Sequence, residues 1–207
     1  MKILYYAGWS LTRLVSKLLF RIEITGTENI PPTGGFIIAT NHRSYFDPLL
    51  AGSWLRRQVY FLGKAELFKN KLFGWVITRT NALPVKRGTI DRNAVKLCVE
   101  VIEKGYGLTV FPEGTRARGV DFLSPKPGIG IIATQTKVPI VPAYIHGSNR
   151  LKSCFLGLRE RMEMFIGPPI PAEQVASFPA NKEGYFQLAE LVMSRIKEIQ
   201  SQMRPAK

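Results

Sequence analysis

The stretch GGFIIATNHRSYFDP, residues 34–48, decides the fold that this 207-residue chain is expected to adopt. Its first half, GGFIIAT, follows a PPTGG turn and is rich in β-branched and aromatic residues, which predicts a buried strand. Polar residues begin abruptly at Asn41, and DPLLAGSWLR then predicts a helix that starts at an Asp-Pro pair. A strand that runs through a polar loop into a helix is typical of α/β domains, which tend to place their chemistry at such strand ends.

The rest of the chain repeats this alternation. Further strands are predicted at RIEIT (21–25), QVYFLGK (58–64), ALPVKR (82–87), VPIVPAYIHG (138–147) and RMEMFIGPPI (161–170), and GLTVFPEG (107–114) is predicted as a strand that runs into a loop. Helices are predicted at NKLFGWVITRT (70–80), 89–104, PGIGIIATQT (127–136) and the last 25 or so residues. We therefore expect a single α/β domain without internal repeats, with a mostly parallel or mixed central sheet flanked by helices.

The composition indicates an anionic partner. Lysine and arginine total 29 against 15 acidic residues, which gives a formal net charge of +14. Nucleic acid, anionic lipid and phosphorylated substrates all match such a charge. The two cysteines, Cys98 and Cys154, are far apart and form no Cys/His cluster, which argues against a zinc site or a disulfide framework and favours a reducing compartment.

The N-terminal segment has the pattern of a basic amphipathic helix over residues 2–22. Apolar residues recur at helical spacing at Leu4, Ala7, Leu11, Leu14, Val15, Leu18 and Ile22. The charges are all cationic: Lys2, Arg13, Lys17 and Arg21. Such a helix is suited to the membrane interface, with its apolar face in lipid and its cations near lipid phosphates. The alternative is an ordinary helix packed on the domain.

We therefore divide the chain into a membrane-association helix, 1–22, and a domain, 23–207. The sequence contains no run of about 18 or more uncharged apolar residues, so a membrane-spanning helix is not expected. A signal peptide is not expected either, because the charges interrupt the apolar stretch. The expected location is the cytoplasmic face of the cell membrane, as a peripheral or monotopic protein.

His42 and Asp47 carry the first chemical hypothesis. Four residues separate them, a spacing that a turn can fold back so that the carboxylate accepts a hydrogen bond from one imidazole nitrogen. The other nitrogen then becomes a general base that takes a proton from a hydroxyl as its oxygen attacks a thioester carbonyl. The alternative is that Asp47 only caps the following helix and that His42 is structural.

A second polar loop follows another apolar strand at VFPEGTRAR. Arg116 is suited to a two-pronged contact with a phosphate, while Glu113 is suited either to holding a glycerol hydroxyl or to bracing the loop. Gly114 allows the backbone to approach a ligand closely. An ordinary polar turn with an Arg and Glu pair is the alternative.

NHRSYFDP together with FPEGTRAR resembles the paired NHxxxxD and FPEGTR blocks of the glycerolipid acyltransferase family, whose best-known members acylate lysophosphatidic acid. ALPVKRG, which contains Arg87, and VPIVPAYIHG, centred on Pro142, are similar to two further blocks in the same order. The resemblance runs from about Asn41 to Gly147, half of the chain, and four ordered blocks are more specific than either motif alone.

The resemblance implies a role for each matching residue. His42 is the base and Asp47 orients it, Arg87 and Arg116 bind the acceptor phosphate, and Glu113, Gly114 and Thr115 shape that pocket, with Lys126 as a further contact. It implies acyl transfer from acyl-CoA or an acyl carrier protein to the free hydroxyl of 1-acylglycerol-3-phosphate, giving phosphatidic acid. It also implies monotopic membrane attachment and no metal or redox cofactor.

Three alternatives remain open from the sequence. The acceptor can be glycerol-3-phosphate or another lysophospholipid, and the protein can be a lipid-binding module without turnover. Residues 56–92 carry nine Lys or Arg against two acids, interleaved with aromatic residues, a pattern that fits anionic lipid, a solvated basic face or nucleic acid. No nucleic-acid-binding motif accompanies it, so nucleic acid is not the expected partner.

Overall fold

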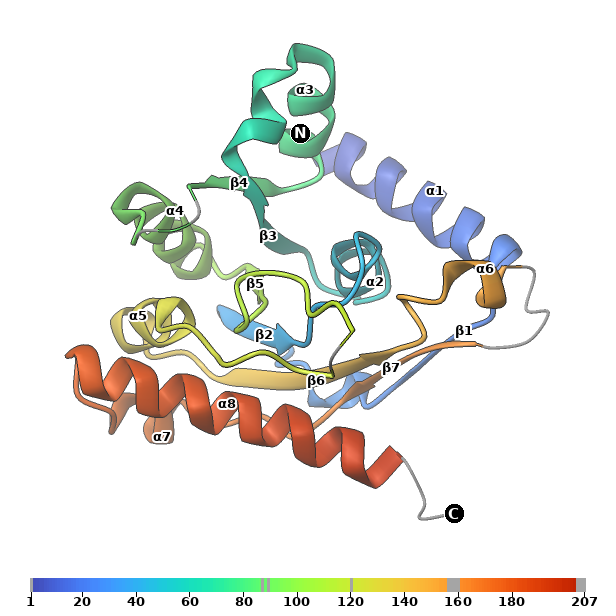
Figure 1. The fold of residues 1–207 in the computed structure, drawn as a ribbon. Helices are drawn as coiled ribbons and strands as arrows, with labels where there is room; N and C mark the ends of the chain where they lie inside the picture. The colour runs from blue at the N-terminus through green and yellow to red at the C-terminus, as the bar shows by residue number, and fades with distance from the viewer. Residues whose placement is uncertain (1, 87, 89, 120, 156–160, 204–207) are drawn as a thin grey trace.

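In the computed structural model, which describes residues 2–86, 88, 90–119, 121–155 and 161–203, one mixed sheet forms the centre of the molecule (Figure 1). Among the described residues its strand order is β1-β7-β6-β2-β5-β3-β4. The strands are β1 Ile22–Thr25, β2 Phe36–Thr40, β3 Val59–Lys64, β4 Ala82–Val85, β5 Gly107–Val110, β6 Ile140–His146 and β7 Met162–Ile166. The expected single α/β domain with a mixed sheet is confirmed.

Helices connect these strands. The α-helices are α1 Lys2–Leu19, α2 Asp47–Ser53, α3 Lys71–Arg79, α4 Arg92–Glu103, α5 Gly128–Thr136, α6 Leu151–Cys154, α7 Ala172–Ala176 and α8 Lys182–Met203. Two short 3-10 helices are η1 Thr27–Asn29 and η2 Ala65–Lys69. The sequence patterns did not indicate α6, α7, η1 and η2, because such short helices have too few turns to show a 3.6-residue period.

Strand direction determines which loops meet. Strands β6, β2, β5, β3 and β4 run parallel, whereas β7 is antiparallel to β6, and β1 is parallel to β7. The start of β1 therefore lies at the edge of the sheet where β2 and β5 end. As a consequence, the last turn of α1 reaches the same edge as the polar loop that begins at Asn41.

The core has two layers, one on each face of the sheet. Helices α4, α5 and α8 cover one face, with buried side chains that include Cys98, Ile102, Ile129, Ile132, Leu188, Val192 and Ile196. Helix α2 covers the other face, through Leu50 and Ala51 (Figure 1). All five residues of β2 are buried, as is typical of a central parallel strand that is covered on both sides.

Helix α1 packs on the domain with one side and leaves the other side open. The indole Nε1 of Trp9 donates to the carbonyl of Leu55 at 3.2 Å, and Nε1 of Trp54 donates to Oγ of Ser16 at 3.3 Å. The guanidinium of Arg13 lies 5.0 Å from the centroid of each of these two indole rings. The predicted helix is confirmed, and it ends at Leu19 rather than at residue 22.

The outer side of α1 exposes Leu11, Leu14, Val15 and Leu18, which lie on one helical face. α1 is thus packed on the domain and amphipathic at the same time. No helix in the described part of the chain is both long enough and apolar enough to span a bilayer.

The start of α4 differs from the prediction for a local reason. Helix α4 begins at Arg92 rather than at 89, because the Asp91 carboxylate caps it by accepting the backbone N–H groups of Asn93 and Ala94. Strand β5 ends at Val110 and runs into a loop, as the sequence predicts, and Gly114 in that loop has a φ of +66°.

Candidate active site

The two polar loops leave the sheet side by side. Strands β2 and β5 are parallel neighbours, with Ala39 opposite Val110, so the loops that begin at Asn41 and Phe111 start at the same edge. The backbone N–H of Ala117 donates to the His42 carbonyl at 2.8 Å, which joins the loops directly. Residues separated by about 70 positions in the sequence therefore form one site.

His42 and Asp47 are in contact. Nδ1 of His42 lies 2.8 Å from Oδ2 of Asp47, and both side chains are buried, with exposed fractions of 6% and 0% for the two residues. The same Oδ2 accepts the backbone N–H groups of Arg43 and Ser44, each at 2.7 Å. Asp47 is thus bonded back to the loop and makes no side-chain cap for α2. The carboxylate fixes the imidazole so that Nε2 remains as the nitrogen that can accept a proton.

Glu113 is completely buried and connects three segments. Its Oε1 accepts the backbone N–H of His42 at 2.9 Å, and its Oε2 accepts the backbone N–H of Leu123 at 2.8 Å. Burial raises the pKa of Glu113, and the two backbone hydrogen bonds oppose that shift. The sequence left two roles open for Glu113, holding a glycerol hydroxyl or bracing the loop. These contacts match the second role.

Arg116 lies over an aromatic ring from the other loop. Its guanidinium carbon is 3.5 Å from the centroid of the Tyr45 ring, and Tyr45 itself is 79% exposed. Stacking leaves the edges of the guanidinium, where the N–H donors are, free to bind an anion. Thr115, beside Arg116, is exposed. Both residues are therefore accessible to a ligand at the surface of the site.

Gly114 and Lys126 lie against each other. A Cβ atom on residue 114 would lie 2.9 Å from Cδ of Lys126, and the φ of +66° at this position also favours glycine. The backbone N–H of Lys126 donates to the carbonyl of Pro112 at 2.8 Å, which holds the lysine beside the loop. The close approach that the sequence led us to expect at Gly114 is made here by the stem of Lys126.

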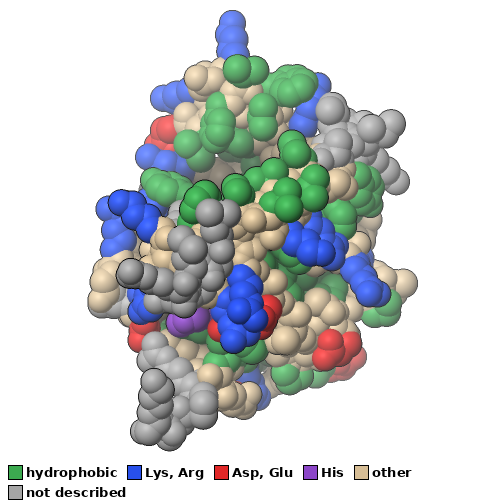
Figure 2. Space-filling model, turned by 90° about the vertical axis from the view of Figure 1, so that its right-hand side faces the viewer, with side chains coloured by type: hydrophobic (Ala, Val, Ile, Leu, Met, Phe, Trp, Pro, Cys, Tyr) green, Lys and Arg blue, Asp and Glu red, His purple; other side chains and the backbone are tan. Residues whose placement is uncertain are grey.

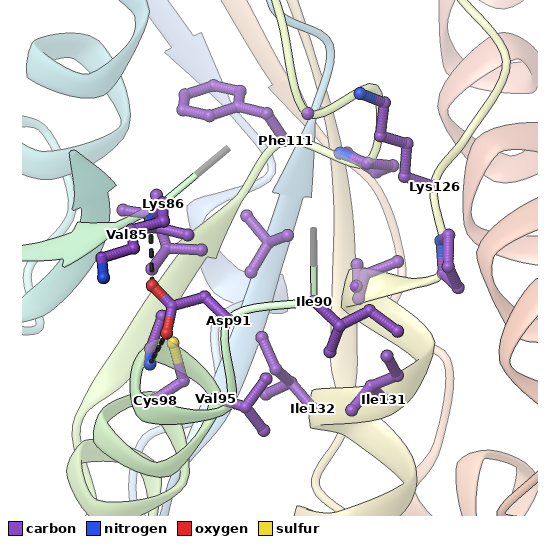
Figure 3. Close-up of a pocket in the computed structure, with 18 of the residues that line it drawn as sticks. Val85, Lys86, Ile90, Asp91, Val95, Cys98, Phe111, Lys126, Ile131 and Ile132 are labelled. Atoms are coloured by element: carbon purple, nitrogen blue, oxygen red, sulfur yellow. Dashed lines mark hydrogen bonds between the residues drawn. The ribbon is translucent and has the colours of Figure 1, made fainter. Parts of the chain in front are cut away.

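A cavity of about 340 Å³, which His42 helps to line, runs between α4 and α5 (Figure 3). This volume lies within the range of roughly 300–1,000 Å³ that is typical of ligand pockets. Phe111 and Lys126 lie at one end of the view, and Cys98 and Ile132 at the other. Most of the wall is apolar, from Leu62, Val85, Ile90, Val95, Val110, Ile129 and Ile131. The cavity is suited to a hydrocarbon chain whose polar end lies at His42.

The model of the family described as Acyltransferase matches residues 21–146, which is more than half of the chain and includes both loops. The chain belongs to the acyltransferase family. This enzyme is 29% identical over 192 residues to the 1-acyl-sn-glycerol-3-phosphate acyltransferase of Bacillus subtilis (strain 168), an alignment that covers 92% of this chain and 94% of that protein. The family resemblance seen in the sequence is confirmed.

A solved structure extends the similarity to the whole chain. The crystal structure of the 1-acyl-sn-glycerophosphate (LPA) acyltransferase from Thermotoga maritima superposes with a TM-score of 0.71 at 26% identity, covering 100% of this acyltransferase and 81% of that chain. A relative that is named for a different acceptor is the lyso-ornithine lipid O-acyltransferase of Pseudomonas aeruginosa. It is 31% identical over 112 residues, which cover 54% of this chain and 42% of that protein.

Arg87 of this acyltransferase lies outside the described residues, so its predicted phosphate contact stays a prediction. Its neighbour Lys86 lines the cavity. The backbone N–H of Lys86 donates to Oδ2 of Asp91 at 2.9 Å, which ties the end of β4 to the start of α4 (Figure 3).

Two residues of the acyltransferase site were not singled out from the sequence. The ring of Phe111 stacks on the His42 imidazole, with 4.0 Å between centroids and 21° between planes. Asn41 is buried, and its side chain bonds both backbone groups of Ile145: Nδ2 donates to the carbonyl at 3.0 Å, and Oδ1 accepts the N–H at 2.7 Å. Their places in the two motifs were the available signal, because Asn41 directly precedes His42 and Phe111 lies two positions before Glu113.

Proposed function

We propose that this acyltransferase transfers a fatty acyl group from a thioester to the free hydroxyl of 1-acylglycerol-3-phosphate, with His42 as the general base. The observation that carries the proposal is the contact of 2.8 Å between His42 and Asp47 beside an apolar cavity that His42 helps to line. An oriented imidazole, a place for an acyl chain and nearby cations are the parts that this reaction requires. The similarity to 1-acylglycerol-3-phosphate acyltransferases along most of the chain supports the same reaction.

The chemistry needs one proton transfer in each direction. Nε2 of His42 takes the proton of the acceptor hydroxyl as that oxygen forms a bond to the thioester carbonyl carbon. The tetrahedral intermediate then breaks its C–S bond, and the imidazolium returns the proton to the leaving thiolate. The products are the ester and the free thiol of the carrier. Asp47 stabilises the transient positive charge on the ring and keeps Nδ1–H directed away from the substrate.

The substrate groups are assigned by chemistry. The apolar cavity between α4 and α5 takes the acyl chain of the donor, which is acyl-CoA or an acyl carrier protein. Arg116 and Lys126 bind the acceptor phosphate, together with Arg87, as the resemblance implies. Thr115 and Gly114 shape that region, while Glu113 holds His42 through its backbone. No metal or redox cofactor is required for these steps.

Both proposed substrates carry long apolar chains, which supports a site at a membrane surface. Helix α1 ends at the same edge of the sheet as the site and exposes an apolar face. Its cations Arg13 and Lys17 and the net charge of +14 favour an anionic leaflet. A peripheral or monotopic position on the cytoplasmic face of the cell membrane, held by α1, is therefore part of the proposal.

The test is acyl transfer by the purified protein to labelled lysophosphatidic acid in vesicles, with acyl-CoA and acyl carrier protein donors in parallel. His42→Ala should lower turnover by a factor on the order of 100 or more, because the general base is lost. His146→Ala is the matched control, since His146 is the other histidine and stands at the end of β6. Unchanged turnover in His42→Ala would rule out the proposed base.

A panel of acceptors tests the second part of the proposal. Because one relative is named for a lyso-ornithine lipid, the panel includes an acceptor without a phosphate. If Arg116 and Lys126 bind phosphate, 1-acylglycerol-3-phosphate should react faster than glycerol-3-phosphate, larger lysophospholipids or lyso-ornithine lipid. Vesicle binding without transfer to any acceptor would indicate a non-catalytic lipid-binding module instead.

A further inference from the structure

Helix α3 presents large apolar side chains to solvent. Leu72, Phe73, Trp75 and Val76 are exposed to 76, 47, 49 and 42%, and we call these four residues the α3 face. The only residue of α3 that is buried is Gly74. A helix on the surface of a globular domain normally buries its large apolar residues and exposes its small or polar ones, so α3 has the inverse arrangement.

Backbone contacts hold α3 in this orientation. A Cβ atom on Gly74 would lie 2.8 Å from the carbonyl oxygen of Phe68, so the helix approaches η2 more closely than any other residue type allows. The start of α3 is capped by Asn70, whose Oδ1 accepts the backbone N–H of Phe73 at 2.9 Å. The apolar side chains are therefore directed outward by a fixed helix.

Cations surround the α3 face. The segment from β3 to the end of α3 contains Lys64, Lys69, Lys71 and Arg79 against a single acid, Glu66. The guanidinium of Arg79 lies 4.1 Å from the centroid of the Trp75 ring. An anionic bilayer complements this pattern, because apolar side chains enter the acyl region while cations remain near the phosphates. A second copy of this chain would bring the same positive charge to the contact and is disfavoured.

The α3 face lies beside α1 and on the side of the catalytic loops. Strand β3 runs parallel to β5 and leads through η2 into α3, so α3 follows the edge of the sheet at which the site opens. Near the N-terminus of α1, a Cβ atom on Gly8 would lie 3.6 Å from Cγ2 of Thr80, at the end of α3 (Figure 1). Figure 2 shows this side of the molecule, with hydrophobic side chains gathered on its upper part and Lys and Arg side chains around them.

The geometry points to α3 as a second lipid contact, which docks on the surface of an anionic bilayer independently of α1. One amphipathic helix lets a protein rotate about the axis of that helix, whereas two contacts at an angle fix its orientation. α1 and α3 together direct the opening of the cavity toward the leaflet that holds the acceptor. Only the orientation of the cavity toward the acceptor rests on the proposed function. Lipid binding by α3 is tested without measuring turnover.

The experiment measures sedimentation of the full chain with vesicles of phosphatidylethanolamine and phosphatidylglycerol. Leu72→Ser combined with Trp75→Ser should weaken binding by about ten-fold or more, because two large side chains no longer enter the lipid. Phe186→Ser, which removes an exposed aromatic side chain from α8, is the matched control and should bind as the native protein does. Thermal unfolding checks that each variant keeps its fold.

Further measurements separate lipid binding by α3 from binding by α1 alone, from dimer formation and from the proposed catalytic function. Leu11→Ser with Leu18→Ser tests α1 alone, and combination with the α3 variant should lower binding further. Turnover of short-chain, water-soluble substrates should be unchanged in the α3 variant, because none of the four residues lines the cavity. The proposal is overturned if the α3 variant binds vesicles as tightly as the native protein does. It is also overturned if the native protein is a dimer and the α3 variant is a monomer. Absence of acyl transfer in the native protein would contradict the proposed function alone.

Discussion

The backbone N–H of His42 donates to Oε1 of Glu113 over 2.9 Å, across 71 positions of the sequence. The other carboxylate oxygen accepts the N–H of Leu123 at 2.8 Å. Glu113 therefore acts through the backbone of His42 and is a positioning residue for the proposed base. The two motifs that resemble the acyltransferase family are parts of one hydrogen-bonded unit.

Glu113→Gln should lower kcat by about ten-fold and change KM for either substrate little. A glutamine amide has one oxygen, so its NH2 group must face one of the two backbone N–H donors, at the cost of roughly 1–3 kcal/mol for a buried donor. Steady-state kinetics with both substrates varied checks this. A rise in the KM of the acceptor with kcat unchanged would instead assign Glu113 to substrate binding.

The raised pKa of Glu113 gives a second signature, in the pH dependence of stability. A carboxyl whose pKa is higher in the folded state binds its proton more tightly when folded. The free energy of unfolding of the native protein should therefore fall, relative to that of Glu113→Gln, as pH rises from the ordinary carboxyl range through the raised pKa. Denaturant titrations at a series of pH values measure the difference. A difference independent of pH would contradict the raised pKa.

Asp47→Asn should reduce kcat by about 100-fold or more while the protein remains folded. The amide oxygen can still accept the N–H groups of Arg43 and Ser44 and the Nδ1–H of His42, but it carries no negative charge to stabilise a charged imidazole. Asp47→Ala should also lower the free energy of unfolding by about 2 kcal/mol or more, because buried donors lose their acceptor. Turnover and denaturant unfolding, measured for both variants, separate the effect of the Asp47 charge on catalysis from the effect of its backbone hydrogen bonds on stability.

Tyr45→Ala should raise KM for the phosphate-bearing acceptor by about three-fold and leave kcat nearly unchanged. The ring of Tyr45 supports the Arg116 guanidinium, and a stack of this kind at an exposed site contributes about 0.5–1 kcal/mol. Tyr45→Phe keeps the ring and should behave as the native protein does. If Tyr45→Ala raises KM equally for a 1-acylglycerol acceptor, which has no phosphate, the ring does not act through phosphate binding by Arg116.

Cys98→Phe should shift donor preference toward shorter acyl chains, and Cys98→Ala toward longer ones. Cys98 is fully buried and lies at the end of the cavity away from Phe111. Thioesters of graded chain length, compared by kcat/KM, measure the shift, and the opposite signs of the two variants are an internal control. Equal loss at every chain length in both variants would mean that only packing was disturbed.

Cys98 should take no part as a nucleophile. Burial raises the pKa of its thiol to about 12, so the reactive thiolate is scarce at neutral pH. Mass spectra of the native protein after incubation with the acyl donor alone should show no covalent acyl group. An added acyl mass on the peptide that contains Cys98 would contradict this.

The contact between His42 and Asp47 could be predicted from the sequence because both residues lie in one short loop after a recognisable strand. The stack between Tyr45 and Arg116 could not, because it joins two loops whose approach depends on β2 and β5 becoming neighbours. For the same reason the sequence left two roles open for Glu113.

Strand direction was the part of the fold that was hardest to predict from the sequence. IEIT and MEMFI have the composition of strands, but nothing in their residues states that β7 runs antiparallel to β6 and carries β1 with it. Direction is set by packing of the whole sheet and by the length of the connections. That reversal brings the last turn of α1 to the edge where the site opens, so the position of the amphipathic helix could be understood only from the structure.

The central place of β2 also has a consequence during synthesis of the chain. Both of its partners come later: Ala39 pairs with Val110, and Thr40 pairs with Ala143. At roughly 5–20 residues per second, about 5–20 s separate the emergence of β2 from that of β6. Strand β5 emerges within that time, so the apolar segment FIIAT at first has no neighbouring strand and then has only one. The loop that carries His42 can take its final shape only after most of the protein has been made.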